Sequence, residues 1–196
     1  MSLTEFLRRV VAILDEAHVP YMLTGSLAAA YYATPRATQD IDLVIDVHEA
    51  GLDRVVDGFL GSGCYVDRPA ALEALRTRGQ FNAIDPESGW KVDLIVRKDR
   101  SFSRMEFGRR RKASLLGVEV TLASLEDVLI AKLEWSRLGN SELQRQDVVQ
   151  LLERGGDRLE MDYLARWIGE LDLDTEWQAV KARVAKRTSP NQEPSG

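Results

Sequence analysis

The chain has very little of what disulfide-bonded and zinc-binding proteins require. Its 196 residues include one cysteine, Cys64, so no internal disulfide is possible, and this fits a reducing, cytoplasmic compartment. The chain has only two histidines in addition to that cysteine, so a His/Cys zinc site of the structural type is excluded. Any bound metal must therefore be held by oxygen ligands, which points to Mg²⁺, Mn²⁺ or Ca²⁺.

Long apolar runs are missing as well. No stretch of the sequence reaches the roughly 18 residues that a membrane-spanning helix needs. The N-terminal segment 1–18 is interrupted by Arg8, Arg9, Asp15 and Glu16, which indicates an amphipathic helix and not a secretory signal. We therefore expect no membrane partner.

The charge balance argues against a protein that binds mainly duplex DNA. Such proteins are usually basic, whereas the formal net charge here is -5. One segment departs from this balance, because residues 97–112 hold far more cationic than acidic side chains. Two interpretations stay open for it: a solvated loop or strand edge, or a lip that faces phosphate and makes binding of RNA conceivable.

Apolar periodicity predicts an α/β (α+β) core over residues 1–122, a helical part over 123–187 and a disordered tail over 188–196. In the core, helical spacing covers 3–17, a stretch from 27, 50–60 and 70–78, and strand patterns cover 21–24, 41–47, 81–85, 90–96 and 116–122. Further helices are expected from 125 and over 142–154, 160–170 and 174–187. Apolar stripes on these helices include Trp135, Trp167 and Trp177, which we expect in the core or at an interface.

Three aspartates stand out within the predicted strands. Asp40 and Asp42 are two residues apart at the start of the strand at 41–47, so their side chains point to the same face. Two such carboxylates repel each other unless a cation lies between them. Asp93 lies in an otherwise apolar strand, where a lone charge is costly unless it is paired. If the two strands are neighbours, the three carboxylates converge and would hold the metal ions of a phosphoryl-transfer site. The alternatives are a solvent-facing pair for Asp40 and Asp42, and for Asp93 an edge position or a pairing with a buried arginine.

A glycine turn precedes these aspartates. Gly25-Ser26 stands between a short strand and a helix, where glycine allows a tight turn and a close approach of the backbone. The free N–H groups of the following helix and the Ser26 hydroxyl would suit a phosphate. The alternative is that Ser26 is an ordinary helix N-cap.

The order Gly25-Ser26, then Asp40-Ile41-Asp42, then Asp93 in a later strand resembles the nucleotidyltransferase superfamily, which has a DNA polymerase β-like fold. The run at 35–43, and the helical stretch at 125–133 followed by 145–148, is similar to small bacterial members related to AbiEii-type toxins. This likeness covers roughly residues 18–152. It implies a mixed sheet flanked by helices, followed by the C-terminal helical part.

The resemblance also implies a reaction, in which a nucleoside monophosphate passes from a Mg²⁺- or Mn²⁺-bound nucleoside triphosphate to an acceptor hydroxyl. It implies triphosphate binding for Gly25 and Ser26, metal binding for Asp40, Asp42 and Asp93 (the last as ligand or base), and contact with phosphate or acceptor for Lys132. Arg36 and Thr38 flank the aspartate pair and are added as nucleotide-binding candidates. For Arg36 and Lys132 the alternative is an ordinary surface position.

The acceptor stays open between RNA, protein and a small molecule, and one role within the family is the toxin of a toxin–antitoxin pair. A second hypothesis comes from a different class: a non-catalytic protein of the same fold that acts as a partner in a protein complex or as a homo-oligomer. The tryptophan-bearing helical part and the acidic net charge motivate it.

Overall fold

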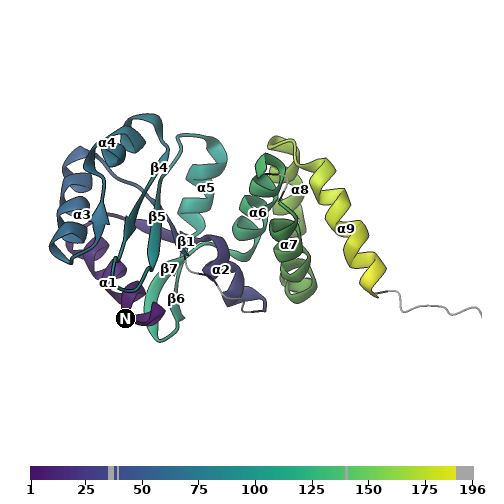
Figure 1. The fold of residues 1–196 in the computed structure, drawn as a ribbon. Helices are drawn as coiled ribbons and strands as arrows, with labels where there is room; N and C mark the ends of the chain where they lie inside the picture. The colour runs from purple at the N-terminus through teal and green to yellow at the C-terminus, as the bar shows by residue number, and fades with distance from the viewer. Residues whose placement is uncertain (35–37, 39, 140, 189–196) are drawn as a thin grey trace, which may run out of the picture. The chain divides into compact units, whose positions relative to one another are not determined.

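The structure is a computed structural model that describes residues 1–34, 38, 40–139 and 141–188 (Figure 1). The chain forms two compact units, one from Met1–Tyr31 and Pro35–Ser124 and the other from Tyr32–Thr34 and Leu125–Gly196. Arg36 and the tail expected to be disordered, apart from its first residue, lie outside the described residues.

The first unit is built on one mixed sheet, which confirms the predicted α/β fold. Within the described residues it has seven strands in the spatial order β3-β4-β5-β2-β1-β7-β6. The strands are β1 (Tyr21–Thr24), β2 (Asp40–Ile45), β3 (Tyr65–Val66), β4 (Gln80–Ile84), β5 (Lys91–Val96), β6 (Arg111–Leu115) and β7 (Val118–Leu122). The pairs β2–β5 and β1–β7 are parallel, and the other pairs are antiparallel.

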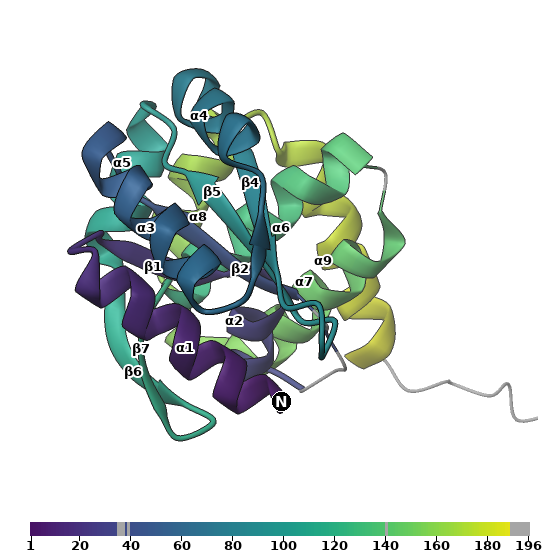
Figure 2. The ribbon, with the colours of Figure 1, turned by 60° about the vertical axis from the view of Figure 1, so that its left-hand side comes forward.

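Apolar side chains hold helices against one face of this sheet. The helices of the unit are α1 (Leu3–Glu16), α2 (Gly25–Tyr32), α3 (Glu49–Gly61), α4 (Arg68–Thr77) and α5 (Ser101–Arg109). Figures 1 and 2 show α1, α3 and α4 together on one face. In β2 and β5 the residues Ile41, Leu43, Val92 and Leu94 are fully buried, whereas the residues between them are only half-buried. The two faces of the central strands therefore differ, and the less buried face carries the aspartates.

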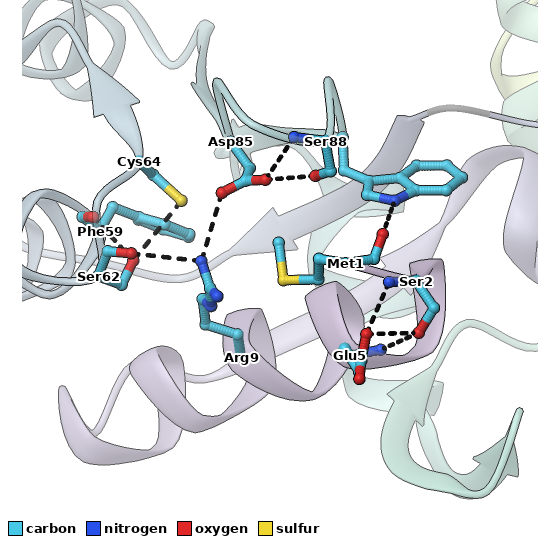
Figure 3. A network of polar contacts seen from close by, with 10 residues as sticks. Met1, Ser2, Glu5, Arg9, Phe59, Ser62, Cys64, Asp85 and Ser88 are labelled. Carbon is cyan, nitrogen blue, oxygen red and sulfur yellow. Dashed lines mark hydrogen bonds and ion pairs between the residues drawn. The ribbon is translucent and has the colours of Figure 1, made fainter.

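A polar network joins α1 to the turn before β5 (Figure 3). Arg9 Nη1 lies 3.3 Å from the carbonyl oxygen of Ser62 and 3.4 Å from Asp85 Oδ1. The hydroxyl and the N–H of Ser88 both donate to Asp85 Oδ2, the N–H over 2.9 Å. The Ser88 hydroxyl above all, then its N–H and the Arg9 guanidinium, lower the pKa of Asp85 below its ordinary value of 3.8, although burial raises it. The ionised carboxylate thus joins α1 to the turn that leads into β5.

Segment 97–112 forms neither a loop nor a strand edge over most of its length. Ser101–Arg109 is helix α5, and β6 begins at Arg111. Much of the positive charge is matched by local partners. Arg97 Nη2 lies 3.2 Å from Asp46 Oδ1, Arg104 Nη1 lies 2.5 Å from Asp99 Oδ1, and the Arg110 guanidinium lies 4.0 Å from the Phe107 ring centroid.

The second unit is helical, with α6 (Leu125–Gly139), α7 (Glu142–Gly155), the 3₁₀ helix η1 (Gly156–Arg158), α8 (Met161–Glu170) and α9 (Asp174–Thr188). Trp167 and Trp177 are buried in it, as predicted. Trp135 is 51% exposed, so it is not a core residue, and for it the expectation of an interface position stays a prediction. None of the described helices is long and apolar enough to cross a membrane.

We expect Asp85→Asn to lower the thermal unfolding temperature at pH 7, because the amide cannot supply the negative charge that Arg9 contacts. A carboxyl whose pKa is lowered by folding stabilises the protein above its unfolded pKa and loses that contribution as pH falls through the folded value. The difference from the unchanged protein should therefore shrink below about pH 4. Glu87→Gln, at an exposed position of the same turn, serves as the control. A difference that stays constant with pH would contradict the role of Asp85.

Candidate active site

The strand register places Asp42 and Asp93 side by side. In the parallel pair β2–β5, the Cα partners are Asp42 with Asp93 and Asp40 with Lys91. Thr24 of β1 is the partner of Asp42 on its other side, and Asn82 of β4 is the partner of Asp93. Directly paired residues point to the same face of a sheet, so one row of polar side chains crosses four strands. The two strands that carry the predicted aspartates are neighbours.

Gly25 is the point where backbone comes closest to this row. It begins α2, with a φ of +66°. A Cβ atom built on it would lie 1.9 Å from Asp42 Oδ2, and the backbone N–H of Ser26 donates to the same oxygen over 3.4 Å. Only glycine allows both this conformation and this contact. The start of α2 therefore already binds a negatively charged oxygen, that of Asp42.

Lys91 is a site residue that the sequence reasoning missed. Its Nζ lies 3.0 Å from Asp93 Oδ2 and 3.5 Å from Asp40 Oδ1, so one ammonium bridges two of the three predicted metal ligands. The hydrogen bond and charge of Asp93, with a smaller contribution from Asp40, raise the pKa of Lys91 although burial opposes this. Its position two residues before Asp93 was a usable signal, because alternate residues of a strand share a face.

The donor chemistry of the row fits a hard divalent cation. Carboxylate oxygens are the ligands that Mg²⁺ and Mn²⁺ prefer. Among the residues that the structure describes, however, no group of three or more Asp, Glu, His or Cys side chains is arranged to hold a metal ion. Asp40 and Asp93 are instead drawn to the ammonium of Lys91.

Two other predicted site residues, Thr38 and Lys132, lie outside the row of polar side chains. The Thr38 hydroxyl accepts from the Asp40 N–H over 3.4 Å and lies 3.2 Å from the Asp40 carbonyl oxygen, so it shapes the chain where β2 begins. Lys132 belongs to the helical unit, where it is 3% exposed and its Nζ lies 2.7 Å from Asp147 Oδ2. It is a buried ion-paired lysine and not the surface residue of the alternative interpretation.

Comparisons with known proteins place the fold. No family model and no curated protein matches the chain. Among solved structures, it is similar to the antibiotic-resistance factor ANT(2'')-Ia, with a TM-score of 0.56 and 14% identity over 96% of this chain and 97% of that one. It is also similar to a nucleotidyltransferase-like protein from Paracoccidioides brasiliensis, with a TM-score of 0.51 and 20% identity over 89% and 91% of the two chains.

A third similar structure is the lincosamide antibiotic adenylyltransferase LnuA with lincomycin bound, with a TM-score of 0.52 and 12% identity over 77% of this chain and 96% of that one. ANT(2'')-Ia has also been seen in complex with adenylyl-2''-tobramycin. At these identities the likeness concerns the fold. The chain therefore has a nucleotidyltransferase-like fold, a mixed sheet flanked by helices.

We expect Gly25→Ala to destabilise the protein more than Gly117→Ala. Both glycines have positive φ, +66° and +72°, but a Cβ at Gly117 meets open space. The control substitution should cost about 1–2 kcal/mol from the left-handed conformation alone. Gly25→Ala should cost at least about 1 kcal/mol more, because its methyl group overlaps the Asp42 carboxylate. Denaturant unfolding of both variants measures the difference, and equal losses would show that the Gly25–Asp42 contact is not tight.

A second prediction concerns the buried pair of the helical unit. Lys132→Met should lower the free energy of unfolding by about 3–5 kcal/mol, because it leaves the Asp147 carboxylate buried without its ammonium. The double variant Lys132→Met/Asp147→Leu should recover most of this loss. Chemical unfolding of the single and double variants tests it. A Lys132→Met protein of unchanged stability would favour the ligand-contacting role instead.

Proposed function

We propose that this chain is a metal-dependent nucleotidyltransferase. One observation carries the proposal: Asp42 and Asp93 are paired at one level of two parallel strands, next to the close approach of Gly25. Asp40, two residues before Asp42 on the same face, completes the carboxylate set. The nucleotidyltransferase-like fold and the sequence resemblance both support the same class of reaction.

In the proposed reaction, the oxygen of an acceptor hydroxyl attacks the α-phosphorus of a nucleoside triphosphate. The bond from that phosphorus to the bridging oxygen breaks, and pyrophosphate leaves with the bond electrons. A divalent cation, Mg²⁺ or Mn²⁺, held by Asp40, Asp42 and Asp93, would neutralise phosphate charge. The Asp93 carboxylate accepts the hydroxyl proton in this scheme, and the start of α2 at Gly25 and Ser26 orients the phosphates.

The acceptor and the biological role are inferred from proteins of the same fold and from the sequence resemblance. One structure of the same fold holds adenylyl-2''-tobramycin, and another holds lincomycin. The hydroxyl of a small molecule therefore comes first among the candidate acceptors. The AbiEii-related subtype and a toxin role rest on the sequence resemblance at 35–43 and 125–133. The structure weakens the case that the sequence made for an RNA acceptor, because several cations of segment 97–112 contact local partners.

Calorimetric titration with non-hydrolysable nucleoside triphosphates tests the first step. We expect binding that requires Mg²⁺ and weakens at least about tenfold in Asp42→Asn, because one ligand of the cation loses its charge. Asp46→Asn is the matched control: it removes one charge just beyond the other end of β2, where the side chain faces Arg97. In a transfer assay with an aminoglycoside, a lincosamide and RNA as acceptors, Asp93→Asn should slow turnover about 10²–10⁴-fold.

No binding of any nucleoside triphosphate at millimolar concentration, with or without Mg²⁺, would contradict the transferase. The non-catalytic partner protein would then be the better hypothesis. It has one observation of its own: Trp135 and Leu138 of α6 and Leu143 of α7 are exposed apolar side chains of the helical unit. Stable self-association that Trp135→Ser abolishes, measured by sedimentation, would support it.

A further inference from the structure

The ammonium of Lys91 lies where the carboxylates of the row would otherwise need a metal ion. It bridges Asp93 Oδ2 and Asp40 Oδ1, at 3.0 and 3.5 Å, across the pair of strands that carries all three aspartates. Lys91 is the direct strand partner of Asp40 and lies two residues before Asp93, so the register of β5 against β2 builds the bridge. The contact is a product of the fold, not of a mobile loop.

A divalent cation and this ammonium cannot share the two carboxylates. Both positive charges would lie within a few ångströms of the same oxygens, where repulsion between like charges is strong even at a partly exposed site. The Lys91 side chain is 30% exposed, so rotation of its stem can carry the ammonium away from the row. Metal binding between Asp40 and Asp93 therefore requires that Lys91 leave.

We propose that Lys91 is a built-in counter-ion that occupies the cation position between Asp40 and Asp93 until a nucleotide-bound metal ion displaces it. The proposal rests on the proposed nucleotidyl transfer and adds a positioning residue to it. Lys91 keeps the carboxylates together in the absence of metal and weakens the binding of a free metal ion. A metal ion that arrives with a triphosphate gains the additional phosphate contacts at the start of α2, and these offset the cost of displacing the lysine.

The test is direct binding of Mn²⁺, followed by electron paramagnetic resonance, to the unchanged protein and to Lys91→Gln. We expect Lys91→Gln to bind free Mn²⁺ at least about tenfold more tightly. In the presence of a non-hydrolysable nucleoside triphosphate the difference between the two proteins should narrow. Lys98→Gln, which removes an exposed lysine just beyond the other end of β5, should bind Mn²⁺ as the unchanged protein does.

Thermal unfolding gives a second readout that does not depend on activity. With chelator present, Lys91→Gln should unfold at a lower temperature than the unchanged protein, because Asp40 and Asp93 lose their counter-ion. Saturating Mn²⁺ should raise its unfolding temperature by more than it raises that of the unchanged protein. Lys91→Arg keeps the charge and should bind free Mn²⁺ as weakly as the unchanged protein, which separates the effect of charge from an effect of packing.

Two outcomes would overturn the proposal, and they differ in what they mean for the proposed transferase. If the unchanged protein binds Mn²⁺ and Lys91→Gln binds it equally or less well, Lys91 is not a competing cation, and the proposed transferase stands. If neither protein binds Mn²⁺, alone or with nucleotide, there is no cation position for Lys91 to hold, and the proposed transferase fails as well.

Discussion

Repulsion between two carboxylates at one level of the sheet is the constraint that the surrounding groups satisfy. The parallel register of β2 and β5 makes Asp42 and Asp93 direct neighbours, and neither can move away without breaking the ladder. Each has its own local compensation. The Ser26 N–H donates to Asp42, where Gly25 lets the backbone come close, and the Lys91 ammonium contacts Asp93. Backbone geometry thus places the partial positive charge of the Ser26 N–H beside Asp42, and strand register places the Lys91 ammonium beside Asp93.

The apolar half of the same strands makes this arrangement rigid. Ile41 and Leu43 alternate with the aspartates of β2, and Val92 and Leu94 flank Asp93, all fully buried on the opposite face. A slip of one residue would bury the charges and expose these side chains, so hydrophobic burial fixes the register. The network around Asp85 acts at the turn where the chain enters β5. Burial on one face therefore holds together like charges that would otherwise separate on the other.

The sequence was sufficient for features that depend on local periodicity and insufficient for those that depend on long-range pairing. Spacing of two residues predicted that Asp40 and Asp42 share a face, and apolar alternation located most helices and strands. The sequence could not show that β5 lies next to β2, because strand order is set by contacts between residues far apart in the chain. The convergence of the three aspartates was therefore predicted only on the condition that these strands are neighbours. Lys91 was passed over because its partners are defined only by that order. Helix α5 was missed because it is short and its two buried aromatic residues, Phe102 and Phe107, do not follow a helical repeat, and β3 is too short to show alternation.

The energetic cost of the row itself bears on which function it serves. A carboxylate packed against a turn that only glycine can adopt and three like charges on one face each disfavour folding. A protein that served only as a binding partner would have no use for this repulsion, because an asparagine in place of Asp42 would relieve part of it and could still accept the Ser26 N–H. Costly arrangements of this kind are found where ligands are bound or reactions are catalysed. The Lys91 ammonium offsets part of this repulsion, and a divalent cation bound between the carboxylates would offset more of it, which is why we favour the transferase over the partner protein.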